Sequence, residues 1–203
     1  MTTYLHHHDL PKDIGFKSAI AVDTEAMGLN IIRDRLCLIQ ISQGDGDVHI
    51  VKFDSNFNAP NLTKILVDDK ILKIFHFARF DMAILFHYLK INFSNVYCTK
   101  IASRLVRTYT ESHGLKNLCE ELLGIEISKK QQSSDWGSKN LSDKQLDYAS
   151  SDVLYLHQIK DKLHEIIIRE HRLELFDECL KFLPTRVKLD LAGFSHIDIF
   201  SHS

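Results

Sequence analysis

The spacing of apolar residues predicts strands through the first part of the chain. Four nearly continuous apolar runs, at residues 18–23, 36–42, 48–53 and 71–75, are typical of buried strands. The turn Gly44-Asp45-Gly46-Asp47, between the second and third runs, indicates a hairpin. We therefore expect a meander of three strands, followed by units in which a strand and a helix alternate.

Helical spacing dominates the remainder of the chain. Asn61 is expected to cap a short helix that ends at Val67, and apolar spacing predicts another helix from Asp81 to Leu89. After a last short strand at 96–99, Ser142 and Gln145 form a capping box that begins a long helical region. The helices expected in this part are 101–108, 115–123 and the region from Ser142 to about Leu183. The order of elements predicts an α/β fold in which helices flank a mixed sheet.

Two segments interrupt this plan. Residues 128–140 are polar, and residues 184–203 combine an irregular pattern with large apolar side chains. The apolar residues of the second segment are Val187, Leu189, Leu191, Phe194, Ile197, Ile199 and Phe200. A solvated segment does not usually carry so many of them. We therefore expect residues 1–203 to form one domain whose apolar tail, 184–203, packs on another surface such as a second subunit.

The composition places the chain among globular proteins. Of its 203 residues, 44% are hydrophobic and 26% are charged, which excludes collagen-like, low-complexity and wholly disordered classes. The formal net charge is −2, so there is no general positive field to hold a long nucleic acid. A nucleic-acid ligand would have to be short, bridged by metal ions or gripped locally.

The chain is expected to work in a reducing cytoplasm without a membrane partner. Its four cysteines form no CxxC pair, which argues against a zinc ribbon and against a disulfide framework. No uninterrupted apolar stretch reaches the length of about 18 residues needed to span a bilayer. The first 17 residues are too polar for a signal peptide, and His6-His7-His8 is interpreted as a solvated N-terminal segment.

Acidic residues follow the predicted elements at positions where they can meet. Asp23 and Glu25 are two residues apart at the end of the first strand, so an extended chain would point both to one face. An ordinary strand-end turn is the alternative explanation for this pair. Asp81 opens the helix after the strand 71–75, where the helix dipole stabilises a carboxylate. Tyr148 and Asp152 share one face of a later helix through i, i+4 spacing.

Four carboxylates without a nearby histidine or cysteine suit Mg²⁺ or Mn²⁺ rather than zinc. Two such ions, about 3.5–4 Å apart, form the usual clamp for hydrolysis of a phosphodiester. The candidate metal ligands are Asp23, Glu25, Asp81 and Asp152. Tyr148, whose ordinary pKa is about 10, is better suited to orienting the attacking water than to acting as a free base.

Three motifs resemble those of the DEDDy 3′-5′ exonucleases, and they extend over nearly the whole chain. They are Asp23-Thr24-Glu25, His76-Phe77-Ala78-Arg79-Phe80-Asp81 and Tyr148-xxx-Asp152. Ser134-Asp135-Trp136 and Gln145-Leu146-Asp147-Tyr148-Ala149 are similar to segments of the RNase D-like group. Arg33-Asp34-Arg35-Leu36-Cys37 and Lys130-Gln131-Gln132-Ser133-Ser134-Asp135-Trp136 resemble its nanoRNase C members. Lys139-Asn140 departs from the Arg-Pro of many RNase D sequences, which bears on the path of longer RNA.

The resemblance implies a ribonuclease H-like fold, the DEDD exonuclease fold, with two Mg²⁺ or Mn²⁺ ions in each active site. It also implies a homo-octameric ring with inward-facing sites. Such a ring would trim short RNA, especially dinucleotides, from the 3′ end to 5′-mononucleotides. Asp23, Glu25, Asp81, Tyr148 and Asp152 would be its catalytic residues.

Residues near these motifs are candidates for substrate binding. Met27, Gly28 and Leu29 follow the first motif, where related exonucleases place backbone amides and an apolar wedge against the last bases; ordinary loop packing is the alternative for Leu29. His76 and Phe77 are candidates to stack on a base, worth about 1–3 kcal/mol, although Phe77 suits a core position equally well. Trp136 either covers the ligand or anchors its loop. Basic candidates for the 5′ phosphate or for another subunit are Arg104, Arg107, Lys129 and Lys130.

Three other functions have to be weighed against this one. A DNA exonuclease, or an RNase D-like enzyme for longer chains, would use the same chemistry, because two-metal hydrolysis does not itself require a 2′-hydroxyl. An inactive exonuclease fold kept as a binding module would typically have lost a metal ligand. Here all four carboxylates and Tyr148 are present, so we expect an enzyme.

Overall fold

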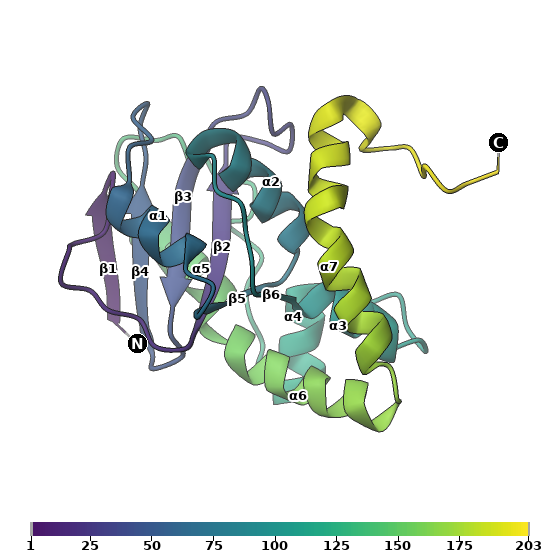
Figure 1. The fold of residues 1–203 in the computed structure, drawn as a ribbon. Helices are drawn as coiled ribbons and strands as arrows, with labels where there is room; N and C mark the ends of the chain where they lie inside the picture. Colours follow the sequence, from purple (N-terminus) through teal and green to yellow (C-terminus); the bar gives the residue numbers. More distant parts are fainter. Residues whose placement is uncertain (1, 203) are drawn as a thin grey trace.

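A six-stranded mixed sheet organises the computed structural model, which describes residues 2–202 (Figure 1). The strands are β1 (Thr2–His7), β2 (Ala19–Ala26), β3 (Leu36–Ser42), β4 (Asp47–Lys52), β5 (Leu72–Phe75) and β6 (Val96–Cys98). They lie in the order β1-β4-β3-β2-β5-β6. The meander β2-β3-β4 is antiparallel, whereas β1 pairs with β4, β5 with β2, and β6 with β5 in parallel. The expected mixed sheet is confirmed.

Helices cover both faces of this sheet. They are α1 (Pro60–Val67), α2 (Ala78–Leu89), α3 (Thr99–Val106), α4 (Leu115–Leu118), α5 (Asp143–Leu154), α6 (Leu156–Arg169) and α7 (Leu173–Leu189), with the π-helical turns η1 (Cys119–Leu123) and η2 (Asp190–Phe194). Ile20 and Val22 of β2 belong to an apolar cluster with α1, α2 and α7, whereas Ala21 belongs to a second cluster with α5 and α6. Because successive side chains of β2 point to opposite faces of the sheet, they contribute to two hydrophobic cores, one on each face.

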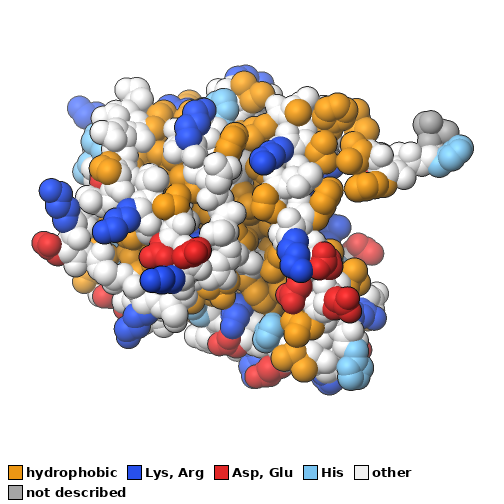
Figure 2. Space-filling view, viewed as in Figure 1, with side chains coloured by type: hydrophobic (Ala, Val, Ile, Leu, Met, Phe, Trp, Pro, Cys, Tyr) orange, Lys and Arg blue, Asp and Glu red, His pale blue; other side chains and the backbone are white. Residues whose placement is uncertain are grey.

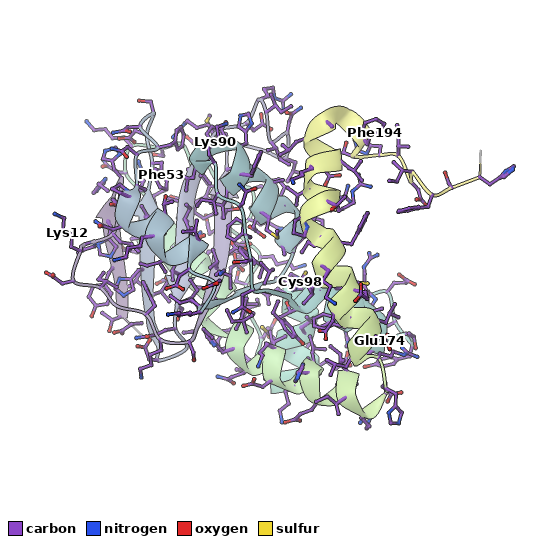
Figure 3. The ribbon with its side chains drawn as sticks, viewed as in Figure 1. Lys12, Phe53, Lys90, Cys98, Glu174 and Phe194 are labelled. Atoms are coloured by element: carbon purple, nitrogen blue, oxygen red, sulfur yellow. The ribbon has the colours of Figure 1, made fainter. Side chains whose placement is uncertain are left out.

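Side chains follow this division between interior and surface. Phe53, which follows β4, and Cys98, at the end of β6, are buried, whereas Lys12 and Lys90 reach the solvent (Figure 3). The four cysteines are free, as their spacing predicted. Within residues 2–202, none of the helices combines the length and the apolar character needed to cross a membrane.

Of the N-terminal histidines, His6 and His7 lie in the strand β1 at the edge of the sheet, where His7 is exposed, and His8 follows the strand. β1 is paired along its length with β4, and the ring of His6 stacks on that of His49 with centroids 5.3 Å apart. The His6 Nε2 and His49 Nδ1 atoms are also 3.0 Å apart. Because β4 lies more than forty residues away along the chain, local periodicity did not indicate this pairing.

Three helices begin earlier than predicted: α1, α2 and also α3, which starts at Thr99 rather than at residue 101. The first starts at Pro60 rather than after a cap at Asn61, and the carboxylate of Asp9 accepts the backbone N–H groups of Asn61 and Leu62 at 3.0 and 2.9 Å. A remote acid therefore satisfies donors that a local cap would otherwise bind. The helix α2 starts at Ala78, so Asp81 lies inside its first turn.

The long C-terminal helical region is divided into α5, α6 and α7, and the last helix continues beyond its predicted end. The capping box of Ser142 and Gln145 is confirmed at the start of α5. Pro184 lies inside α7, which continues to Leu189. Val187 is only 4% exposed in the core, so packing on both sides of the proline offsets the hydrogen bond that its missing N–H removes.

Candidate active site

The strand β2 carries two acids into a cleft beneath α5. It continues through Asp23 and Glu25 to Ala26, with a register shift only after Glu25. The two carboxylates therefore keep the two-residue alternation of an extended strand and share one face. The alternative of a strand-end turn is not what the chain adopts.

Three carboxylates converge at this point. Oxygen atoms of Asp23, Glu25 and Asp152 all lie within 4.8 Å of one another, with Asp152 supplied by α5. Asp81, from the first turn of α2, lines the same cleft and is 3% exposed, but it is not part of this close group. The hydroxyl of Thr24 donates a hydrogen bond to Asp81 Oδ1 at 2.7 Å, which fixes that carboxylate.

Burial, together with crowding for three of them, makes all four acids reluctant to ionise. Burial, followed by repulsion from neighbouring carboxylates, raises the pKa of Glu25 to about 9 and moves the pKa of Asp23 well above its ordinary range. The pKa of Asp152 rises to about 7 through burial and the charge of Asp81. Burial alone raises the pKa of Asp81 to about 7 against the hydrogen bond from Thr24. A cation among these groups would offset the cost of holding their negative charges together in a buried site.

The donor set fits a hard divalent cation. The close group offers only carboxylate oxygens, which Mg²⁺ and Mn²⁺ prefer, without the sulfur or imidazole ligands that zinc sites use. Asp23, Glu25 and Asp152 would hold the cation, and Asp81 lines the same cleft.

Tyr148 lies one helical turn before Asp152 on α5. Burial, and then the charges of Asp152, Glu25 and Asp23, raise the pKa of Tyr148 above its ordinary value, so its hydroxyl stays protonated. The ring packs against Trp136, with centroids 5.9 Å apart. Trp136 is 2% exposed, so it anchors the 128–140 segment while forming part of the cleft wall beside Tyr148.

A single cleft of about 640 Å³ brings together the residues that the sequence singled out. Its lining includes Asp23, Glu25, Met27, Gly28, Leu29, His76, Phe77, Asp81, Trp136, Tyr148 and Asp152. These residues come from β2, the loop after it, the end of β5, α2, the 128–140 segment and α5. Sequence reasoning thus grouped residues that are up to 129 positions apart in the chain.

The loop after β2 exposes apolar side chains at the mouth of the cleft. Leu29 is 86% exposed and Met27 is 59% exposed, which is unlike ordinary loop packing. Position 28 requires a glycine, because a Cβ there would lie 2.3 Å from Asp34 Oδ2 and clash with it. Asp34 in turn accepts the backbone N–H of Asn30 and pairs with Arg33, which shapes the loop.

His76 and Phe77 follow β5 on another wall of the cleft. Burial, followed by the charges of Lys100 and Lys129, lowers the pKa of His76 to about 3, so its ring is neutral. His76 Nδ1 lies 3.0 Å from the hydroxyl of Thr99. Phe77 is 44% exposed, and the Lys100 ammonium lies 4.4 Å from its ring centroid. The ring of Phe77 is therefore exposed in the cleft rather than part of the core.

Several lining residues were given no role by the sequence analysis, among them Thr24, Phe80 and Lys100. Thr24 carried a signal, because a polar side chain between two functional acids at the buried end of a strand needs a polar partner nearby. Of the basic candidates, only Lys129 lines the cleft. Arg107 is 1% exposed and pairs with Glu121 instead, which removes it from the candidates for a phosphate ligand.

The comparisons with known proteins agree with this geometry. The model of the 3′-5′ exonuclease family matches residues 3–168. The structure of Brucella melitensis NrnC bound to pGG is 52% identical, covers 100% of both chains and superposes with a TM-score of 0.96. The structure of Brucella melitensis NrnC with bound Mg²⁺ is 51% identical, again with 100% coverage of both chains, at a TM-score of 0.95.

A curated relative extends the same similarity to longer proteins. Ribonuclease D of Gluconacetobacter diazotrophicus is 30% identical over 155 residues, which is 76% of this chain and 39% of the relative. The chain thus spans about two fifths of the length of this relative.

Proposed function

Because the chain belongs to the 3′-5′ exonuclease family, we propose that it is a metal-dependent exoribonuclease that hydrolyses short RNA, especially dinucleotides, to 5′-mononucleotides. The observation that carries this proposal is the approach of Asp23, Glu25 and Asp152 within 4.8 Å in a cleft that also contains Asp81 and Tyr148. The cleft volume of about 640 Å³ lies within the range of about 300–1,000 Å³ typical of sites that enclose a small ligand.

The four acids and Tyr148 have distinct roles in this proposal. Asp23, Glu25, Asp81 and Asp152 hold two Mg²⁺ or Mn²⁺ ions. When bound, these cations supply positive charge that offsets the charge developing on the attacking and leaving oxygens. The protonated hydroxyl of Tyr148 orients the attacking water, since its raised pKa makes it a poor base.

The products follow from the bond that breaks. The water oxygen bonds to the last phosphorus as the bond from phosphorus to the 3′ oxygen breaks. That 3′ oxygen ends protonated on the shortened chain, and the terminal nucleotide leaves as a 5′-monophosphate. Leu29, exposed at the cleft mouth, would separate the last two bases, while His76 and Phe77 line the wall on which a base would stack.

The NrnC relatives support the finer parts of the proposal. One was solved bound to pGG and another with Mg²⁺, which favours short RNA and a magnesium cofactor. We further propose that residues 1–203 act as one exonuclease domain in the cytoplasm. Its tail, 184–203, would contribute to a homo-octamer.

The test is hydrolysis of 5′-phosphorylated RNA oligonucleotides of two to seven nucleotides with Mg²⁺ or Mn²⁺, beside matched DNA and an EDTA control. We expect the RNA dinucleotide to be hydrolysed fastest. Asp23→Ala and Asp152→Ala should abolish turnover with an unchanged circular dichroism spectrum, because each removes a metal ligand. Asp147→Ala, an exposed acid on the same helix as Asp152, should retain activity.

Other outcomes would redirect the proposal. Equal or faster cleavage of the longer RNAs would indicate an RNase D-like enzyme, and a preference for DNA would indicate a DNA exonuclease. Activity of Asp23→Ala in the presence of excess metal would contradict the site. Tyr148→Phe should slow turnover yet preserve metal binding, and loss of metal binding would contradict the role assigned to the hydroxyl.

A further inference from the structure

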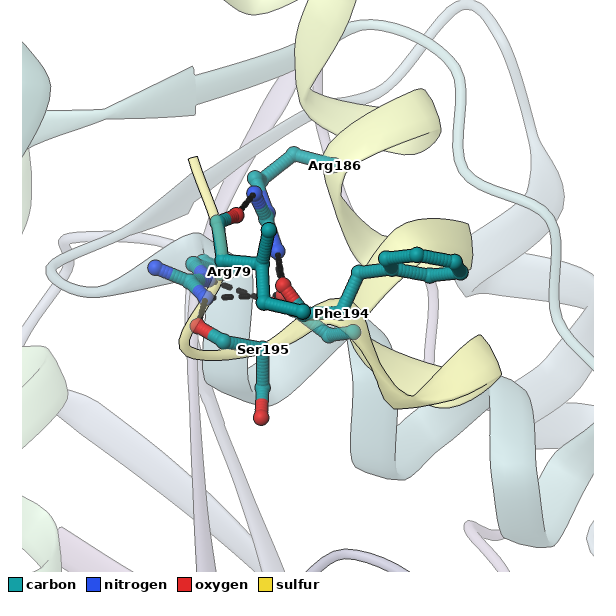
Figure 4. A network of polar contacts seen from close by, with 6 residues as sticks. Arg79, Arg186, Phe194 and Ser195 are labelled. Carbon is teal, nitrogen blue, oxygen red and sulfur yellow. Dashed lines mark hydrogen bonds and ion pairs between the residues drawn. The ribbon is translucent and has the colours of Figure 1, made fainter. Parts of the chain in front are cut away.

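Two arginines enclose one buried carboxylate at the C-terminal end of α7 (Figure 4). Arg79 of α2 donates to both oxygens of Asp190, from Nε at 2.5 Å and from Nη2 at 2.7 Å. Arg186 of α7 donates to Asp190 Oδ1 from Nε at 2.9 Å. The side chain of Asp190 is 6% exposed, so we call Arg79, Asp190 and Arg186 the carboxylate clamp.

The clamp also fixes the backbone after α7. Arg79 Nη2 donates to the carbonyl of Ser195 at 2.8 Å, and Arg186 Nη2 donates to the carbonyl of Phe194 at 2.5 Å. Burial alone would raise the pKa of Asp190, but the hydrogen bonds from Arg79 and Arg186 outweigh it and hold that pKa below its ordinary range. The carboxylate is therefore ionised and forms charge-assisted bonds, which are about twice as strong as neutral ones.

The clamp is connected to the catalytic cleft by the first turn of α2, which contains Arg79 and also residues that line the cleft. Arg79 lies between Phe77 and Asp81, and the backbone N–H of Phe80 donates to the Phe77 carbonyl at 2.9 Å. A second cavity of about 760 Å³ is lined by Arg79 and Asp190. Leu29, Phe77 and Phe80 line both this cavity and the catalytic cleft, so they form the wall between the two.

We propose that Asp190 is a positioning residue for substrate binding, which acts through Arg79 to hold the Phe77 and Phe80 wall of the catalytic cleft. The inference rests on the proposed exoribonuclease activity, because it assigns the wall to the binding of RNA. Asp81 belongs to the same turn but has its own anchor in Thr24. Loss of the clamp should therefore affect the aromatic wall more than the metal ligand.

The test compares Asp190→Asn with the wild type on the 5′-phosphorylated RNA dinucleotide. Asparagine keeps the shape but offers one oxygen acceptor instead of two, so the two-point bond from Arg79 is lost. We expect KM to rise roughly five- to tenfold while kcat stays within about twofold. Arg79→Lys, which retains the charge but not the forked geometry, should give an intermediate KM.

Two controls separate positioning from a general loss of structure. Glu178→Gln removes the partner of Lys181 in an exposed ion pair on the same helix and should change neither constant, because such pairs contribute little. In the double variant Asp190→Asn, Phe77→Ala, the two effects on KM should not multiply, because both act on one wall. A fall in kcat at unchanged KM, two unchanged constants, or multiplicative effects would each overturn the proposal.

Hydrogen exchange distinguishes failure of the clamp from failure of the proposed function. Without RNA, amides in the first turns of α2 should exchange faster in Asp190→Asn than in the wild type or in Glu178→Gln. If the wild type does not cleave the dinucleotide, the proposed function fails. Equal exchange in the three proteins would overturn the clamp whatever the activity.

Discussion

Single residues on the two faces of β2 have different tasks at the candidate site. Asp23 and Glu25 share one face of the strand, and Thr24 between them alternates to the other face, where its hydroxyl donates to Asp81 at the wall of the same cleft. Thr24 is 6% exposed, so its hydroxyl has no competing water and orients one oxygen of the Asp81 carboxylate. A non-ligand residue thereby links the first and second motifs.

Thr24→Val should therefore weaken metal-dependent turnover while preserving shape. Valine keeps the branched side chain but cannot donate to Asp81, and loss of such a partner usually costs roughly 10- to 100-fold in metal affinity or activity. Titration of kcat against Mg²⁺ concentration measures the effect. Thr108→Val, at an exposed position away from the cleft, is the matched control. Equal behaviour of the two variants would show that the Thr24 hydroxyl does not support the metal site.

At the scale of elements, the start of α5 determines where Tyr148 and Asp152 lie. Ser142 accepts the N–H of Gln145, and the Gln145 side chain accepts the N–H of Ser142, which closes the capping box. Ser142→Ala should reduce the free energy of unfolding by about 1 kcal/mol. Urea denaturation measures this, with the exposed Ser94→Ala as control. An equal loss in both variants would contradict a specific contribution from the cap.

Elements with a strong local signal were predictable from the sequence. The apolar run of β3 has the observed bounds Leu36–Ser42, and the capping box marked the start of α5. Elements defined by distant partners were not. β1 depends on β4, the first turn of α1 depends on Asp9, and α7 passes Pro184 because the core covers it.

The same distinction holds for the candidate site. The spacing of Asp23 with Glu25, and of Tyr148 with Asp152, places each pair on one face, so their grouping could be predicted. Lys100 lies over Phe77 only because β6 pairs with β5 and ends beside it. Neither residue carries a local pattern that indicates this contact. The clamp around Asp190 was hidden for the same reason, since its arginines are 107 positions apart.

For the whole molecule, the buried acids make stability depend on pH and on metal. Their raised pKa values mean that, above about pH 4, the folded protein binds more protons than the unfolded chain until the folded groups titrate, at about 7 for Asp152 and about 9 for Glu25. The free energy of unfolding of the metal-free protein therefore falls as pH rises through this interval. A bound cation favours the ionised carboxylates, so its stabilising effect should grow with pH.

Thermal unfolding at about pH 6 and pH 8, in EDTA and in Mg²⁺, measures this dependence. Mg²⁺ should raise Tm more at the higher pH. Histidines with lowered pKa values, such as His76, make the free energy of unfolding in EDTA rise with pH and so oppose the effect of the acids. The decisive comparison is therefore between the pH dependence of Tm in the wild type and in Glu25→Gln. Glutamine mimics the protonated acid, and the variant should lose Tm less steeply with pH than the wild type. Identical slopes would contradict the ionisation of Glu25 as a source of instability.

The C-terminal surface makes a prediction about assembly. Hydrophobic side chains gather over the end of α7 and the segment beyond it (Figure 2), and Ile197 and Phe200 are 52% and 76% exposed. The rings of Phe182 and Phe200 lie 5.9 Å apart, so this surface spans helix and tail. Exposed apolar groups that gather in this way mark a protein interface more often than a free surface.

Ile197→Ser with Phe200→Ser should therefore reduce the mass of the proposed homo-octamer in light scattering. Point changes test this better than removal of 184–203, which would also delete the buried Val187 and Asp190 and so disturb the core and the clamp. Val67→Ser, an exposed apolar position at the end of α1, is the matched control. An unchanged mass would mean that assembly uses another face. A smaller particle that keeps its activity would show that the cleft is complete within one chain.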